Sequence, residues 1–152
     1  MAKLSRRETL VLGVGCATLT AVAGWGEGAQ AGPREAADLI AKFTAGKTTQ
    51  KGKVALDLPE IAENGNIVPL SVSVDAPMAA DNYVSAVLVV AEKNPAPEVV
   101  RFNFTPMSGK AEASTRIRLA ESQMVTVVAK TSKGEFFTNQ KLVKVTVGGC
   151  GG

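Results

Sequence analysis

The sequence predicts an all-β fold, an immunoglobulin-like β-sandwich of about seven strands with a short N-terminal helix and a flexible C-terminal arm. From Gly52 onward, apolar residues alternate with polar ones at the period of a β-strand, and clusters of Gly, Pro, Asn and Ser interrupt the alternation. Before Gly52, one stretch has the period of a helix. No internal repeat or second domain boundary is visible, so residues 32–147 are predicted to form one domain.

The first 31 residues are typical of an export signal. Ser5-Arg6-Arg7 precedes an apolar run from Leu10 to Trp25, and the small-residue site Ala29-Gln30-Ala31 follows it. Paired arginines indicate the twin-arginine route, so Arg6 and Arg7 are predicted to direct export and cleavage is expected after Ala31. The alternative is a membrane anchor, but the run is shorter than the about 20 residues that cross a bilayer. The processed chain is expected to be periplasmic and free of the membrane.

Residues Pro33 to Ala45 are predicted to form the helix. Ala36, Leu39, Ile40 and Phe43 recur at helical spacing and therefore share one face. A proline at the first position and a glycine directly after the last fit the start and the end of a helix.

Seven segments have the character of strands. Apolar residues alternate with polar or small ones around Val54 to Leu58 and from Val68 to Val74. Pro69 indicates an edge position or a bulge, because proline cannot donate a ladder hydrogen bond. Asn64-Gly65 is predicted to be a turn. The other five predicted strands are Tyr83 to Ala91, Glu98 to Phe104, Ala113 to Leu119, Met124 to Lys130 and Glu135 to Val147.

The strand from Ala86 to Ala91 is apolar at every position, so both of its faces avoid water. One face can join the core of a two-layer sandwich, but the other face needs a cover. The sequence leaves two alternatives open, namely a partner subunit or the N-terminal helix.

The last five residues, 148–152, form the predicted C-terminal arm. The final strand is expected to be anchored by its apolar face as far as Val147, with nothing packed beyond that residue. Gly148 and Gly149 are predicted to act as a hinge, because glycine has the widest backbone freedom. The slim tip consists of Gly151, Gly152 and Cys150, and three residues beyond the strand span at most roughly 10 Å. Cys150 is thus expected to enter a narrow pocket of another protein.

Composition excludes several classes of function. The chain has no histidine, which removes the commonest general base and the commonest metal ligand, so no catalytic residue and no metal site are predicted. The net charge of +3 is scattered and aromatic residues are few, which argues against a nucleic-acid partner. No cofactor is expected.

Cys150 is the only cysteine outside the predicted export segment. Its neighbours are glycines, so its reactivity would come from access and from activation by another protein. Three alternatives remain open: an incidental residue, a cysteine that tethers a non-catalytic interaction module through a disulfide, or an enzyme whose thiol is activated by a distant lysine.

The sequence resembles the SoxY family, the sulfur carriers of bacterial thiosulfate-oxidising Sox systems. The resemblance rests on the twin-arginine leader, on the stretch Gly52 to Gly65, which contains Leu58-Pro59-Glu60-Ile61, and on the terminal motif Val145 to Gly152. It extends over nearly the whole of residues 32–152.

The resemblance implies a covalent carrier and no enzyme. It implies that Cys150 is joined to thiosulfate by a SoxAX-type c-type cytochrome, that a SoxB-type dimanganese hydrolase releases sulfate, and that a SoxCD-type molybdenum–haem dehydrogenase oxidises the remaining sulfane sulfur. It further implies a stable complex with a SoxZ-like subunit.

Overall fold

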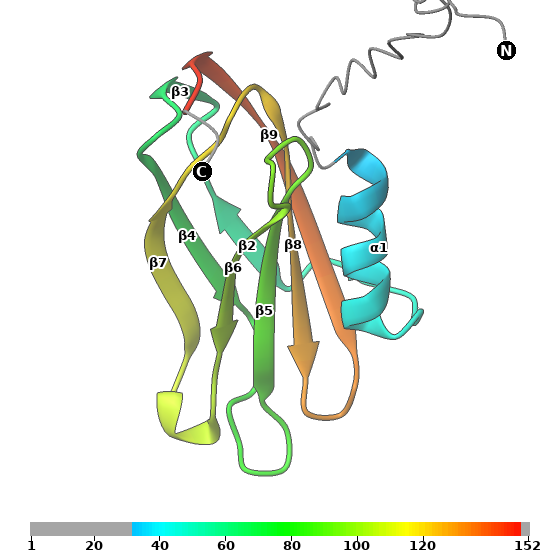
Figure 1. Ribbon diagram of the computed structural model, residues 1–152. Coiled ribbons are helices and arrows are strands. Elements are labelled where there is room, and N and C mark those ends of the chain that lie inside the picture. Colours follow the sequence, from blue (N-terminus) through cyan, green and yellow to red (C-terminus); the bar gives the residue numbers. More distant parts are fainter. Residues whose placement is uncertain (1–31, 150–152) are drawn as a thin grey trace, which may run out of the picture.

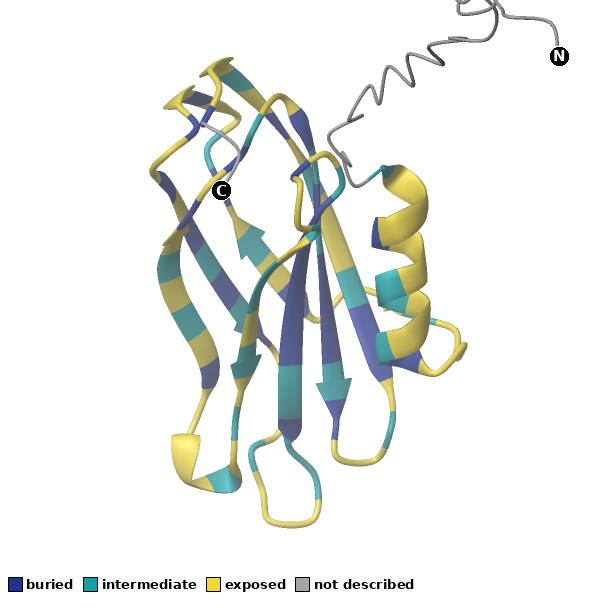
Figure 2. Cartoon of the chain, viewed as in Figure 1, coloured by how far each residue is buried: buried dark blue, intermediate teal, exposed yellow. Residues whose placement is uncertain are grey.

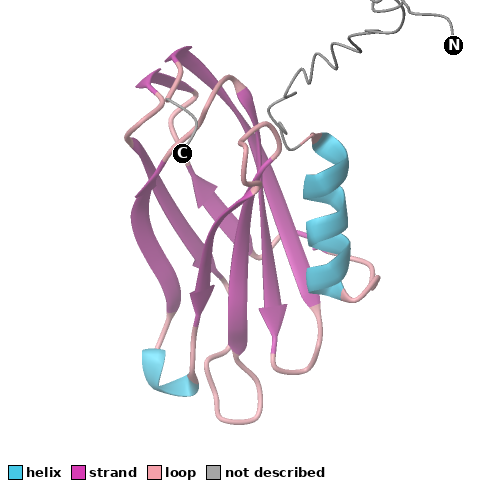
Figure 3. Cartoon of the chain, viewed as in Figure 1, coloured by secondary structure: helices cyan, strands magenta, loops and turns pink. Residues whose placement is uncertain are grey.

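The computed structural model describes residues 32–149, and these form a two-layer β-sandwich with one α-helix on its outer side (Figures 1 and 3). The predicted all-β fold is confirmed. Residues 1–31 and 150–152, which include Arg6, Arg7, Ala31, Cys150, Gly151 and Gly152, lie outside the described residues. The elements are α1 (Pro33–Thr44), β1 (Gln50–Lys51), β2 (Val54–Asp57), β3 (Ile61–Asn64), β4 (Val68–Val74), β5 (Val84–Ala91), β6 (Glu98–Asn103), the short 3-10 helix η2 (Pro106–Ser108), β7 (Ala111–Ile117), β8 (Gln123–Thr131) and β9 (Phe136–Val147).

All seven predicted strands are present, and two short strands join them. The larger sheet has the order β1-β9-β8-β5-β6, and the smaller sheet has the order β2-β4-β7. β1 and β3 both run parallel to β9, β1 beside its beginning and β3 beside its end. The sequence missed β1 because it has only two residues, and it missed β3 because Ile61-Ala62-Glu63-Asn64 does not alternate between apolar and polar residues. Their pairing with a strand far along the chain is a tertiary feature.

The core lies between the two sheets, where the buried residues of both gather (Figure 2). β4 shows the expected alternation, with Val68, Leu70, Val72 and Val74 buried. Pro69 lies in the part of β4 that extends past β2, so it occupies an edge position on that side, as predicted.

Helix α1 covers the second apolar face of β5. Leu88 and Val90 are fully buried in a small cluster with Ala36, against which Leu39, Ile40 and Phe43 pack. Of the two alternatives, the helix is therefore the cover, and the hypothesis that a partner subunit covers this face is wrong. The helix ends as expected at a glycine, because Ala45 and Gly46 both adopt the left-handed conformation. The helices within residues 32–149 fall short of the length and apolar character that a bilayer-spanning helix needs.

Phe43 fixes the last turn of α1 to the sandwich. Its ring meets the Phe136 ring edge-on at a centroid distance of 6.1 Å, and the Arg101 guanidinium lies 5.4 Å from its centroid. We expect Phe43→Ala to lower the free energy of unfolding by about 2 kcal/mol, since the ring is only partly buried. Urea denaturation measures this loss, with Met107→Ala at a 94% exposed position as the control. Equal loss in both variants would show that the helix is not held by this ring.

Candidate functional site

β9 carries the chain to the candidate site. It pairs with β8 along most of its length and with β3 at its end, where Asn64 lies opposite Val147. Val143 is fully buried, Val145 is partly buried and Val147 is 61% exposed, so the apolar anchoring of the strand fades at its end as predicted. The end of β9, β3 and the connection from β7 to β8 lie at one end of the sandwich (Figure 1).

The chain returns to the sandwich at Gly149, two residues beyond Val147. Gly149 is buried, and its backbone N–H donates a hydrogen bond to the carbonyl oxygen of Leu119 at 3.0 Å. The expectation that nothing packs after Val147 is therefore wrong for Gly149, whereas Gly148 is exposed. The sequence could not reveal this contact because it is made by the backbone, which carries no residue pattern.

Three backbone hydrogen bonds connect the end of the chain, at Val147 and Gly149, with Gly65 and Leu119. The Gly65 N–H donates to the Val147 oxygen at 2.8 Å, and the Leu119 N–H donates to the Gly65 oxygen at 2.8 Å. The bond from Gly149 to Leu119 completes the set. We call Gly65, Leu119 and Ala120 the arm clamp, since their backbones contact the first two residues of the arm.

The arm clamp requires glycine at two positions. A Cβ atom on Gly65 would collide with the Leu119 carbonyl oxygen and lie 2.7 Å from the Gly149 nitrogen. A Cβ atom on Gly148 would collide with the Ala120 carbonyl oxygen. Gly65 does lie in a turn, as predicted, but its φ angle is not positive. It is glycine because two backbones approach closely there, a role that the turn pattern Asn64-Gly65 did not reveal.

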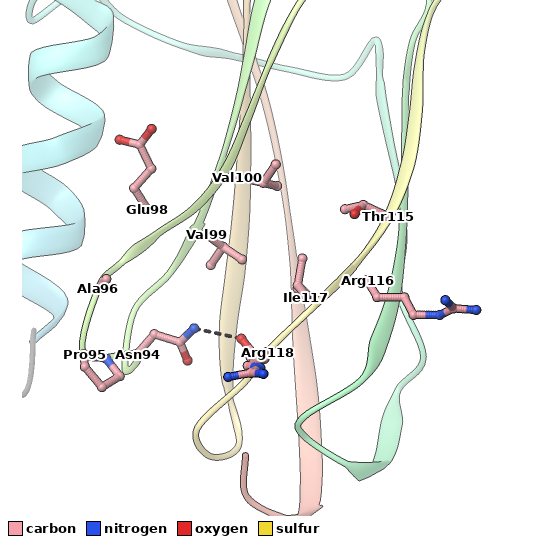
Figure 4. A pocket seen from close by; sticks show the side chains of 10 residues that line it. All are labelled: Asn94, Pro95, Ala96, Glu98, Val99, Val100, Thr115, Arg116, Ile117 and Arg118. Carbon is pink, nitrogen blue, oxygen red and sulfur yellow. Dashed lines mark hydrogen bonds between the residues drawn. The ribbon is translucent and has the colours of Figure 1, made fainter. Parts of the chain in front are cut away.

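A buried polar network holds the clamp segment in place. The Asn94 side-chain amide donates to the Arg118 carbonyl at 2.8 Å (Figure 4), and its oxygen accepts from the Ala120 N–H at 3.0 Å. The same oxygen accepts from the Gln123 side chain at 2.9 Å. Asn94 and Gln123 are both buried, so these groups depend on each other for hydrogen bonds.

The two sides of residues 118–120 have different partners. Arg118 and Ala120 present their backbone groups to Asn94, whereas Leu119 presents its groups to Gly65 and Gly149. Alternate residues of an extended backbone point in opposite directions. The cleft of about 410 Å³ in Figure 4 lies between β6 and β7, and Asn94 and Arg118 help to line it, whereas Gly65 and Gly149 are not among its lining residues.

The residues described at this site hold the backbone in place, and few of them could act as an acid or a base. No group of three or more His, Cys, Asp or Glu side chains that could hold a metal gathers within residues 32–149. Of the predicted site residues, the structure places Gly148 and Gly149, and it joins them to Gly65, Leu119 and Ala120. The arrangement can hold a terminal peptide by its backbone and so fix where the following residue begins.

The sequence model of the SoxY family, described as sulfur oxidation protein SoxY, matches residues 40–150. Among solved structures, the sulfur carrier protein SoxY from Chlorobium limicola f thiosulfatophilum is similar, with 30% identity and a TM-score of 0.60. That similarity covers 73% of this chain and 96% of the Chlorobium chain.

A second group of similar structures shares the fold alone. The superoxide reductase (neelaredoxin) from Ignicoccus hospitalis has 16% identity and a TM-score of 0.56, covering 80% of this chain and 98% of its own. Comparison with curated proteins gives no match. The family match reaches residue 150, so it includes the arm clamp and the position directly after Gly149.

Proposed function

The chain belongs to the SoxY family of sulfur oxidation proteins, and on this premise we propose that it carries sulfur intermediates covalently on Cys150 during thiosulfate oxidation. The observation that carries the proposal is the position of Cys150, directly after the last anchored residue and at the end of the family match. The structure anchors the chain through Gly149, and the family match ends at the next residue, the one cysteine downstream of the predicted export segment.

The proposed chemistry begins with an oxidation. The Cys150 thiol and thiosulfate form a sulfur–sulfur bond, giving a cysteine S-thiosulfonate, one proton and two electrons, and a c-type cytochrome of the SoxAX type accepts the electrons. Water then attacks the terminal sulfone in a SoxB-type hydrolase. The products are sulfate, a proton and a persulfide on Cys150.

The persulfide is the substrate of the next step where a SoxCD-type dehydrogenase is present. Three water molecules supply oxygen as the outer sulfur becomes a sulfonate, with release of seven protons to water and six electrons to the dehydrogenase. A second hydrolysis releases sulfate and restores the thiol. Each step is carried out by a partner enzyme, and this chain acts as the covalent carrier.

The proposed location and partners follow from the same premise. The paired Arg6 and Arg7 and the site at Ala31 support export of the chain to the periplasm. A SoxZ-like subunit is the proposed stable partner. Its contact surface differs from the outer face of β5, since α1 already covers Leu88 and Val90.

Intact mass spectrometry tests the carrier proposal. Protein purified from the periplasm of cells growing on thiosulfate is expected to carry a thiosulfate or sulfur adduct that maps to Cys150 and is removed by a thiol reductant. The control is the same protein from cells growing without reduced sulfur. Unmodified thiol in both samples would contradict the proposal, and a disulfide between Cys150 and another protein would favour a tethered interaction module.

A further inference from the structure

We infer that Gly65 is a positioning residue for the carrier reaction, because it completes the arm clamp that holds Gly148 and Gly149 against the domain. The contacts of the arm clamp are those of described residues. Their consequence for the delivery of sulfur to partner enzymes rests on the proposed carrier function. The backbones fit closely at two positions. Gly65 and Gly148 face different carbonyl groups, and neither position has room for a Cβ atom.

The arm clamp shortens the reach of the cysteine. From Val147, an extended arm could carry Cys150 roughly 10 Å away from the strand. With Gly149 buried and hydrogen-bonded to Leu119, only one peptide unit separates the cysteine from the domain. Consecutive Cα atoms are about 3.8 Å apart, so covalent geometry limits how far the Cα atom of residue 150 can lie from that of Gly149 while the clamp is closed. A deep enzyme pocket therefore requires the clamp to open.

Opening the clamp breaks few contacts. The hydrogen bond from the Gly149 N–H to Leu119 must be lost, but the bonds from Gly65 to Val147 and from Leu119 to Gly65 can remain. One hydrogen bond of average net strength shifts a population by about threefold to tenfold. The closed arm is thus the resting state, and the open arm is accessible to a partner that competes for the Gly149 backbone. Gly148 and Gly149 act as the predicted hinge once the clamp is open.

Two single substitutions are expected to open the clamp. Gly65→Ala places a methyl group against Leu119 and Gly149, and Gly148→Ala places one against Ala120. Gly148→Ala lies after the last strand, so it opens the clamp even if Gly65→Ala impairs folding. Gly32→Ala is the matched control, because a Cβ atom there meets nothing within 4 Å.

The experiment measures the rates at which two reagents alkylate Cys150, and it compares the ratio of these rates between variants. Each variant is the whole chain without the predicted export segment. Iodoacetamide is small, whereas a maleimide on a long polyethylene glycol chain needs an extended arm. We expect both variants to raise the rate with the bulky reagent relative to the small one by at least about threefold. A change in stability alone leaves this ratio unchanged when the domain is folded. An unchanged ratio in folded Gly148→Ala would overturn the inference.

Amide hydrogen exchange provides a second measurement. The Gly149 N–H is expected to be protected in the natural protein and in Gly32→Ala, and unprotected in Gly148→Ala. An unprotected Gly149 amide in the natural protein would show that the clamp is not the resting state. Failure of the clamp is distinct from failure of the carrier: sulfur can load on Cys150 with no change in the alkylation ratio, and the ratio can change in a protein that loads no sulfur.

Discussion

Cys150→Ser is expected to reduce thiosulfate-dependent electron transfer, in a system reconstituted with all partner proteins, to the rate measured without the carrier. The serine oxygen cannot form the sulfur–sulfur bond on which each proposed intermediate depends. The fold and the partner complex should be unaffected, because serine differs from cysteine in the γ atom alone and the sandwich is formed by elements within residues 32–149. Reduction of the cytochrome after addition of thiosulfate measures the effect.

A conservative substitution nearby separates loss of the thiol from damage to the arm. Thr146→Ser changes an exposed residue of β9 by one methyl group and is expected to retain full activity. Thermal unfolding of both variants should match that of the natural protein. Normal turnover by Cys150→Ser would refute the carrier proposal.

Asn94→Ala is expected to lower the free energy of unfolding by about 3 kcal/mol, more than Phe43→Ala does. The change removes the partner of the Arg118 carbonyl, of the Ala120 N–H and of one donor of Gln123. Leaving a buried polar group without a partner costs about 1–3 kcal/mol, and entry of water offsets part of the total. The melting temperature of a domain of this size should fall by about 10 °C.

The control for Asn94→Ala is Asn103→Ala, which truncates an exposed asparagine of β6. Its effect on the free energy of unfolding is expected to be within about 0.5 kcal/mol. Chemical denaturation of both variants measures the difference. Similar values for the two would show that the buried network contributes no net stability, and that the clamp segment is held by the packing of Leu119 alone.

Elements that depend on local sequence patterns could be predicted, whereas contacts between distant segments could not. Helix α1 was predictable because Ala36, Leu39, Ile40 and Phe43 recur at a period that a single helix imposes. The apolar run of β5 showed that both of its faces must be covered, but it could not identify the cover. The choice of α1 depends on how the chain between Thr44 and β2 turns back, which no local pattern specifies.

The sequence by itself determined the fold class, the family resemblance and the single cysteine downstream of the predicted export segment, because these depend on residue identity and short-range period. Only the tertiary structure decided where the arm begins. Gly65, Leu119 and Gly149 are not adjacent in the chain, and they meet through hydrogen bonds between backbone groups, which leave no pattern of side chains in the sequence. In the sequence, Gly65 indicated a turn and Gly148 a flexible hinge, whereas in the structure glycine at both positions provides the space in which two backbones pack.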